Sequence, residues 1–351
     1  MKDIITSIFL KDFKSFAGNH VVNFAPLTIL AGVNSSGKSS VIQGLRIWNN
    51  CYGNEFLGNY GINDIGHFDD MLCDCSDADT FAISIKIGNE NTQFELIFSE
   101  KDKLDNSKEH QELFKCFSQK KIYNVSAHRL GPQVFFHNNE NFCEFNETGN
   151  NIVHFYENNK KNRCIILHPN SESDTLIDNI DAWMSEISPG VRLNFISDPD
   201  QDTSRIAIGE SGRPKKYRAT NVGFGISYTL PIVLLLLCSK PGDIIIIENP
   251  EAHIHPMGQS KIAELMAIAA NNGVQVIIET HSDHIINGVR VAIKQGKITH
   301  RDIAINFFHR DAENGLSDIT QIYADERGEL TKWPKDFFDQ SMKDLSILLS
   351  K

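Results

Sequence analysis

Short apolar runs alternate with turn residues at the N-terminal end of the chain, and this pattern predicts β-strands. The runs cover residues 4–10, 21–24 and 27–30, and the breaks between them contain glycine, asparagine and proline. Because these residue types favour turns, three successive strands are expected. A helix is expected after them, over residues 40–48.

Residues 81–87 and 94–98 are two further apolar runs, and they flank a turn sequence of glycine, asparagine and glutamate. That arrangement predicts a β-hairpin. The polar and charged segment 100–121 is typical of a surface helix or an insertion. Residues 122–219 show little periodicity apart from a predicted helix over 175–187, so an irregular middle region is expected.

Strongly apolar segments return in the last third of the chain. Residues 244–247 are four isoleucines, residues 274–278 are mostly apolar, and the amphipathic segment 258–271 lies between them. Two apolar strands joined by a helix indicate a parallel sheet that is covered on both faces. The expected fold class is therefore α/β.

The C-terminal segment 342–349 resembles an amphipathic helix, with apolar positions at Leu345, Ile347, Leu348 and Leu349. These side chains are enough to bury one face of the helix. We therefore expect the tail to dock on the rest of the protein as a closing helix.

The 351 residues can form one large α/β domain or two modest ones. With 34 basic and 45 acidic residues the formal net charge is −11, so the average surface repels polyanions. Any contact with nucleic acid then has to come from a local patch. The segment 213–218 mixes basic residues with a tyrosine and is a candidate, but a solvated loop is the favoured interpretation.

Seven cysteines are present without a CxxC pair, which is typical of reduced thiols in a cytoplasmic protein. The N-terminus lacks the apolar core of a signal peptide, and the longest apolar run, residues 230–238, is too short to cross a bilayer. We therefore expect a cytoplasmic protein with no membrane partner.

Residues 32–39 read Gly-Val-Asn-Ser-Ser-Gly-Lys-Ser and fit the phosphate-binding loop pattern G-x-x-x-x-G-K-[ST]. In this pattern the glycines let backbone N–H groups curl around a phosphate, the lysine reaches the phosphate oxygens, and the last hydroxyl coordinates Mg²⁺. We therefore expect a nucleoside triphosphate with Mg²⁺. The candidate binding residues are Gly32, Asn34, Ser35, Ser36, Gly37, Lys38, Ser39 and Ser40.

Polar side chains follow both of the apolar strands in the last third of the chain. Glu248 and Glu251 come after the first strand, and His281 comes after the second. Because ligand sites in parallel sheets lie at the carboxyl ends of the strands, these groups are expected where a Mg²⁺ ligand and a hydrolytic base are needed. A transition-metal site is the minor alternative, built from His253, His255, His281 and His284.

Four motifs follow one another along the chain: the phosphate loop, Val-Gly-Phe-Gly-Ile-Ser at 222–227, the strand and turn at 244–256, and Glu-Thr-His-Ser-Asp-His at 279–284. Their order resembles the ABC-type ATPase heads of the SMC, RecF and OLD-nuclease class. More narrowly, the chain is similar to stand-alone bacterial AAA-family ATPases that are often encoded beside defence genes. Supporting matches at 13–16, 127–132 and 333–340 extend the resemblance over nearly the whole chain.

The resemblance implies one ABC-type head over residues 1–351. A parallel core sheet flanked by helices would be joined by an antiparallel β subdomain and a helical insertion. Residues 1–100 would hold the N-terminal strands, the phosphate loop and the hairpin, and 101–220 the insertion and variable middle. Residues 221–310 would hold the signature, the Walker B motif and the switch histidine, and 311–351 the tail.

The resemblance also implies roles for individual residues. Ser39 and Glu248, the latter as the Walker B acid, would bind the Mg²⁺ of ATP, and His281 would sense the γ-phosphate. Gly225 and Ser227 would form the signature motif, which in such heads contacts ATP on the opposite subunit. ATP would then hold together a homodimer or a higher homo-oligomer.

Two departures from the family pattern affect the expected chemistry. Glu248-Asn249 stands where such heads usually carry Asp-Glu, so the usual base position holds an amide that cannot accept a proton. Slow hydrolysis is therefore expected, with Glu251 and His281 as substitute bases. The signature is also abbreviated, and residues 64–69 are a Q-loop candidate by position only.

These features favour a switch ATPase whose dimer controls a separate effector, such as an HNH or Toprim nuclease, in anti-phage defence. The alternative is a RecF-like, DNA-binding ATPase of repair or recombination, which would need a basic surface. A self-contained nuclease of the OLD kind is disfavoured, because only about 70 residues follow His281, fewer than a separate domain ordinarily needs.

Overall fold

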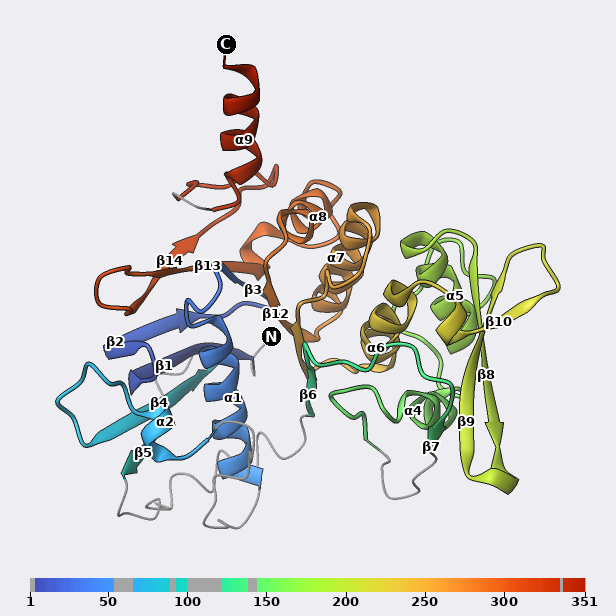
Figure 1. Cartoon of the computed structure of the whole chain (residues 1–351), viewed down its shortest axis with the longest axis horizontal. Helices are drawn as coiled ribbons and strands as arrows, with labels where there is room; N and C mark the ends of the chain where they lie inside the picture. Colours follow the sequence, from blue (N-terminus) through green and yellow to red (C-terminus); the bar gives the residue numbers. More distant parts are fainter. Residues whose placement is uncertain are drawn as a thin grey trace. The chain divides into compact units, whose positions relative to one another are not determined.

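The computed structural model describes residues 4–53, 66–88, 93–99, 121–137, 144–334 and 337–350. The chain divides into two compact units (Figure 1). Unit 1 consists of Met1–Ile122, His300–Asp325 and Glu329–Lys351. Unit 2 consists of Tyr123–Thr299 with Glu326–Gly328.

Unit 1 contains an antiparallel sheet with the strand order β2-β1-β4-β5. Its buried face is rich in aromatic rings, and the rings of Phe81 and Phe98 stack with centroids 4.7 Å apart. The predicted hairpin is confirmed, because β4 and β5 pair antiparallel with Phe81 opposite Phe98. The four strands are β1 (Ile5–Phe13), β2 (Phe16–Asn23), β4 (Thr80–Ile87) and β5 (Gln93–Ser99).

The phosphate-loop strand of unit 1 is β3 (Leu27–Gly32), whose six residues are all buried. It pairs in parallel with β13 (Ile303–Arg310), which in turn pairs antiparallel with β14 (Ser317–Ile322). The predicted helix after the loop is confirmed as α1 (Lys38–Gly53). The short helices α2 (Phe68–Met71) and η3 (His300–Asp302) complete this part of unit 1.

A parallel strand pair forms the centre of unit 2, as the sequence predicts. β11 (Ile244–Glu248) and β12 (Gln275–Thr280) run in register from Ile244 opposite Gln275 to Glu248 opposite Glu279. β6 (Ile122–Val125) lies on the other side of β11. The helices of this region are α6 (Phe224–Cys238), α7 (Pro256–Asn271) and α8 (Asp283–Lys294).

The middle of the chain is more regular than its sequence pattern indicates. β8 (Val191–Asp198) and β9 (Thr203–Glu210) form a long antiparallel hairpin, and β10 and β7 pair with β9. The predicted helix is present as α5 (Leu176–Ile187), with Thr175 as its N-cap. The remaining elements are β7 (Phe136–His137), α4 (Ile152–Asn159), η1 (Pro199–Gln201), β10 (Lys216–Arg218) and η2 (Ala219–Asn221).

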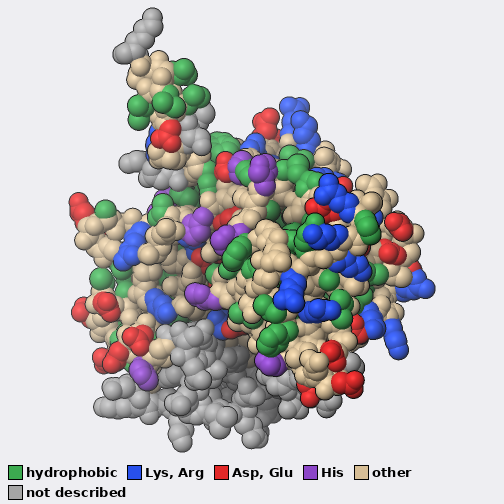
Figure 2. All heavy atoms as spheres, turned by 45° about the vertical axis from the view of Figure 1, so that its right-hand side comes forward, with side chains coloured by type: hydrophobic (Ala, Val, Ile, Leu, Met, Phe, Trp, Pro, Cys, Tyr) green, Lys and Arg blue, Asp and Glu red, His purple; other side chains and the backbone are tan. Residues whose placement is uncertain are grey.

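The expected docking of the C-terminal tail is wrong for the described residues. The side chains of Leu345, Ile347, Leu348 and Leu349 on α9 (Gln340–Leu349) are exposed, Leu348 to 80%, and Figure 2 shows apolar side chains on the projecting helix. Leu345, Leu348 and Leu349 have the i, i+3, i+4 spacing of one helix face, so an apolar stripe is present, but it stays exposed to solvent. Phe337, before the helix, is the buried anchor and packs 5.0 Å from the ring of Phe307.

The fold is thus mixed α/β, with parallel strand pairs in both units and antiparallel sheets beside them. The expected helical insertion over 101–120 lies outside the described residues. Within the part of the chain that the structure covers, no helix has the length and apolar character needed to cross a membrane.

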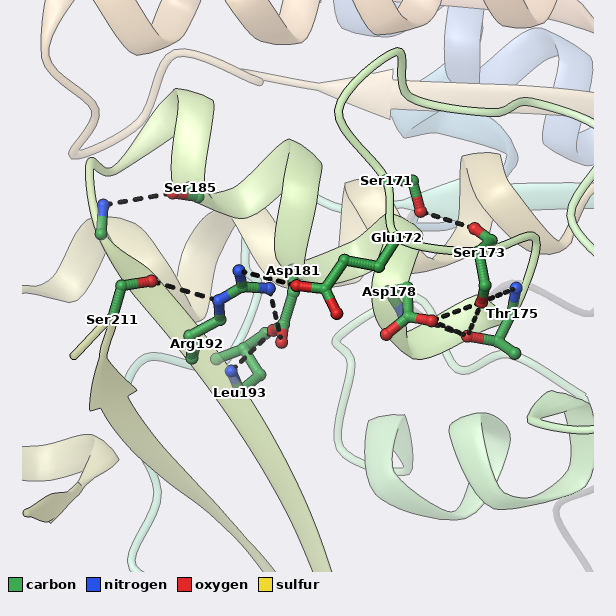
Figure 3. A network of polar contacts seen from close by, with 11 residues as sticks. Ser171, Glu172, Ser173, Thr175, Asp178, Asp181, Ser185, Arg192, Leu193 and Ser211 are labelled. Atoms are coloured by element: carbon green, nitrogen blue, oxygen red, sulfur yellow. Dashed lines mark hydrogen bonds and ion pairs between the residues drawn. The ribbon is translucent and has the colours of Figure 1, made fainter. Parts of the chain in front are cut away.

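A polar network ties α5 to the β8 strand (Figure 3). The Asp181 carboxylate accepts a hydrogen bond of 2.8 Å from the backbone N–H of Leu193, and Arg192 lies 3.5 Å from its other oxygen. Burial raises the pKa of Asp181, and these donors oppose that shift. Asp181 therefore links the helix to the hairpin through one buried carboxylate.

We predict that Asp181→Ala lowers the free energy of unfolding by about 2 kcal/mol, because the buried N–H of Leu193 loses its acceptor. Asp200→Ala, at an exposed position of η1, is the matched control and should leave stability unchanged. Urea unfolding followed by circular dichroism measures both. Equal midpoints for the two variants would contradict the assigned link.

Candidate functional site

The phosphate loop joins β3 to α1 with a backbone path that glycine makes possible. Gly32 and Gly37 have φ angles of +148° and +95°. A Cβ atom on Gly32 would lie 2.4 Å from the carbonyl oxygen of Phe308, and one on Gly37 would lie 2.6 Å from the ring of Phe16. Both positions therefore exclude larger residues for reasons of conformation and space.

Lys38 is buried at the start of α1, and its ammonium group is held within the loop. Its Nζ donates hydrogen bonds to the carbonyl oxygens of Gly32 at 3.1 Å and Val33 at 2.7 Å. The Ser36 hydroxyl also donates to Val33, at 2.8 Å. The loop is thus folded around the lysine, as a phosphate-binding loop requires.

The other loop candidates differ in exposure. Asn34, Ser35 and Ser39 are exposed, and Ser40 is half-buried. The guanidinium of Arg310, at the end of β13, donates to the carbonyl oxygen of Ser35 at 3.2 Å. The glycine cradle, the buried lysine and the exposed Ser39 hydroxyl fit a phosphate group with Mg²⁺. Arg310 had no sequence signal, because only the strand pairing brings it to the loop.

In unit 2, Glu248 lies at the carboxyl end of β11 and is held by donors from the β6 side. The Asn124 amide donates to its Oε1 at 3.2 Å, and the backbone N–H of Ala127 donates to its Oε2 at 3.4 Å. The same Asn124 amide donates to Glu147 at 3.0 Å. Asn124 therefore connects Glu248 with a second carboxylate.

Arg129 is a buried cation that contacts the end of β11 and the residue after it. Its guanidinium donates to the backbone carbonyls of Glu248 at 2.6 Å and Asn249 at 2.8 Å, and to that of Ser126 at 3.0 Å. Burial lowers the pKa of Arg129 to about 10, while the carboxylates of Glu248 and Glu251 act in the opposite direction. The arginine of the 127–132 motif thus holds the end of β11.

Glu251 connects the turn after β11 to the end of β12. Its carboxylate accepts hydrogen bonds from the Thr280 hydroxyl at 2.8 Å and from the backbone N–H of His281 at 2.7 Å. The His281 side chain is exposed. Because both oxygens of Glu251 already accept hydrogen bonds, this geometry suits a group that positions the backbone of His281.

Asn249 has a left-handed backbone with φ of +45°. Its N–H donates to the carbonyl of Glu279 at 2.9 Å, while its buried Oδ1 finds no donor among the described residues. Buried acceptors of this kind are usually satisfied by protein donors or by ordered water.

Gly225 and Ser227, the residues expected to form the signature, lie in the first turn of α6 and are half-buried. A Cβ on Gly225 would lie 2.6 Å from the carbonyl oxygen of His253. The rings of Tyr228 and His253 are 4.6 Å apart, and the Arg129 guanidinium is 5.7 Å from the Tyr228 ring. The start of α6 is therefore packed against the turn that follows β11.

Unit 2 thus links Glu251 to the backbone of His281, holds Glu248 through Asn124 at the end of β11, and packs Gly225 against His253 in the turn that follows. Within the described ranges, no three His, Cys, Asp or Glu side chains gather into a metal-binding group. Positions 64 and 65 of the Q-loop candidate lie outside the described residues, and Phe68 and Asp69 begin α2. Asn124 and Glu147 had no sequence signal.

Two family models match parts of the chain. Residues 184–287 match an AAA domain family described as putative AbiEii toxin, type IV toxin–antitoxin system. Residues 298–348 match a family described as protein of unknown function (DUF3696). No curated protein matches the chain significantly.

Solved SMC heads share the fold. An SMC head bound to the C-terminal winged-helix domain of ScpA is 14% identical, with a TM-score of 0.57 over 97% of this chain and 99% of that one. The SMC head domain from Thermotoga maritima is 14% identical, with a TM-score of 0.52 over 91% and 98%.

A third similar structure is the Pyrococcus furiosus SMC head with an extended coiled coil, bound to the C-terminal domain of ScpA. It is 13% identical, with a TM-score of 0.56 over 99% of this chain and 100% of that one. These structures share the fold of this chain along nearly its whole length. The chain therefore has the mixed α/β fold of an SMC head, and residues 184–287 within it match an AAA domain family.

Proposed function

We propose that the protein is a switch that binds ATP, hydrolyses it slowly and controls a separate effector through an ATP-dependent dimer or higher homo-oligomer. The observation that carries the proposal is the loop from Gly32 to Ser39, folded around the buried Lys38. The description of the matched AAA family as a putative toxin supports a role in defence. A nuclease of the HNH or Toprim kind is the effector class that we favour.

The residues have distinct roles in this proposal. The phosphate loop binds the triphosphate through its backbone N–H groups and Lys38. The Ser39 hydroxyl and the Glu248 carboxylate are the Mg²⁺ ligands, and Mg²⁺ when bound supplies neutralisation of the phosphate charge. His281 senses the γ-phosphate, and Glu251 orients it through the 2.7 Å bond to its backbone N–H.

The signature helix supplies the contact between subunits. Gly225 and Ser227 lie at the start of α6, where backbone N–H groups without helical partners can bind an anion. Phe224 beside them is exposed, as a residue of an interface is before assembly. ATP bound to one copy would therefore be enclosed by the signature of a second copy.

A RecF-like, DNA-binding ATPase is the alternative, and one observation favours it. Arg213, Lys215, Lys216 and Arg218 are exposed in and beside β10, and the Lys215 ammonium lies 4.8 Å from the Tyr217 ring. This basic strand could contact a phosphate backbone despite the net charge of −11. Salt-dependent binding of duplex DNA that is lost in Lys215→Glu/Lys216→Glu would favour this alternative.

We predict that ATP with Mg²⁺ shifts the purified protein from monomer to dimer or a higher assembly, and that Lys38→Ala abolishes the shift because the phosphate loses its cation. Light scattering measures the mass. Lys11→Ala, an exposed lysine on β1, is the control and should still assemble. An unchanged mass of the natural protein at saturating ATP would refute the switch.

A second prediction concerns turnover. Asn249→Glu should raise the rate of phosphate release several-fold, because a carboxylate then stands at the usual base position. The positive φ of Asn249 should make this variant less stable by about 1 kcal/mol. Asn249→Gln, which keeps an amide, is the control and should not gain activity. If the Glu variant is no faster than the Gln variant, position 249 is not a base position.

The close contact at Gly225 gives a third prediction. Gly225→Ala should shift the start of α6 away from His253 and weaken ATP-dependent assembly at least ten-fold, because its Cβ would lie 2.6 Å from a backbone oxygen. Gly223→Ala, two residues earlier, meets no atom within 4 Å and should assemble normally. Sedimentation velocity at graded ATP concentrations compares the two variants. Equal assembly would argue against a role of the signature in the dimer.

A further inference from the structure

Two carboxylates accept hydrogen bonds from the same side-chain amide at the carboxyl end of the parallel strands in unit 2. The Asn124 Nδ2 group donates to Glu248 Oε1 at 3.2 Å and to Glu147 Oε2 at 3.0 Å. An amide NH₂ has two hydrogens, so it can serve both oxygens, which are then at most about 6 Å apart. Glu147 is therefore a near neighbour of the Walker B acid, although it lies far from it in the sequence.

The main chain around Glu147 is held to the segment that carries Arg129. The backbone N–H of Ser126 donates to the carbonyl of Glu147 at 3.0 Å, and that of Leu130 donates to the carbonyl of Thr148 at 2.9 Å. Because Arg129 itself is bonded to the end of β11, the position of Glu147 is set through backbone contacts. The carboxylate is thus placed by the fold and not by a single side-chain contact.

The other candidate bases suit proton transfer less well. The Asn249 amide does not accept a proton from water. Both oxygens of Glu251 accept hydrogen bonds, from the Thr280 hydroxyl and the His281 N–H. Glu147 is half-buried and stands beside the proposed Mg²⁺ ligand Glu248, which is where a hydrolytic base is needed.

Two buried acceptor atoms next to Glu248 also lack donors. Asn124 Oδ1 and Asn249 Oδ1 find no hydrogen-bond partner among the described residues. Buried acceptors of this kind are usually satisfied by protein donors or by ordered water. A water molecule that donates to such an oxygen would be oriented beside the two carboxylates.

We infer that Glu147 is the general base of ATP hydrolysis in this protein. It takes the role that the resemblance assigns to position 249, where this chain has an asparagine. The inference rests on the proposed function. Glu147 takes a proton from water while the water oxygen forms a bond to the γ-phosphorus. The bond from that phosphorus to the β–γ bridging oxygen breaks, its electron pair leaves with ADP, and the products are ADP and phosphate.

The test is Glu147→Gln in the full-length protein. Loss of the base should lower kcat about 100-fold, while the Kd for ATP and the Mg²⁺ concentration for half-maximal rate change less than two-fold. Glu144→Gln, an exposed glutamate of the same segment, is the matched control and should keep the natural rate. Equilibrium binding of a fluorescent ATP analogue and a phosphate-release assay give these quantities.

The conservative variant separates a base from a structural group. Glu147→Asp, which keeps a displaced carboxylate, should have a rate between those of the natural protein and Glu147→Gln, with an unchanged Kd for ATP. If Glu147→Gln does not fold, the rate of Glu147→Asp decides the question, and a rate equal to that of the natural protein would argue against the base.

The outcomes distinguish this inference from the proposed function. If the natural protein neither binds nor hydrolyses ATP, the proposed function is wrong. If it hydrolyses ATP and Glu147→Gln is equally fast, Glu147 is not the base and the switch stands. If excess Mg²⁺ restores the rate of Glu147→Gln, Glu147 is a metal ligand and its assignment as the base is overturned.

Discussion

The hydrogen bonds from Arg129 to the end of β11 are the constraint on which the unit 2 site depends. The guanidinium is buried, and a buried charge is costly unless hydrogen bonds compensate it. The backbone carbonyls of Ser126, Glu248 and Asn249 accept hydrogen bonds from its two terminal nitrogens, and with a pKa of about 10 the group stays charged at neutral pH. The turn cannot move away without leaving the charge unpaired, so the carboxylates around it keep their positions.

The same cation links the turn to the start of α6. The Tyr228 ring lies 5.7 Å from the Arg129 guanidinium and 4.6 Å from the His253 ring, and Gly225 allows the backbone of His253 to approach α6. Glu251 extends the connection to β12 through the N–H of His281. The turn after β11 is therefore in contact with both α6 and the end of β12.

Sequence periodicity predicted the elements with regular apolar spacing and missed those set by tertiary pairing. The sequences of β3, β11 and α7 have a recognisable apolar pattern. The strands are buried along nearly their whole length, and the helix is buried on one side. β8 was missed because only Val191 and Leu193 of its strand are buried. The partnership of Asn124 with Glu147 and Glu248 was beyond prediction, since it spans 124 positions of sequence and depends on neighbouring strands.

The backbone of the turn after β11 favours asparagine at position 249. At φ +45° asparagine is among the few non-glycine residues that adopt the left-handed region readily, whereas glutamate is disfavoured by about 1 kcal/mol. The Arg129 and Glu279 hydrogen bonds fix this conformation. A carboxylate that takes a proton from water is then better supplied by another segment of the chain. Glu147 meets that condition, because its backbone is held by the segment that positions Arg129.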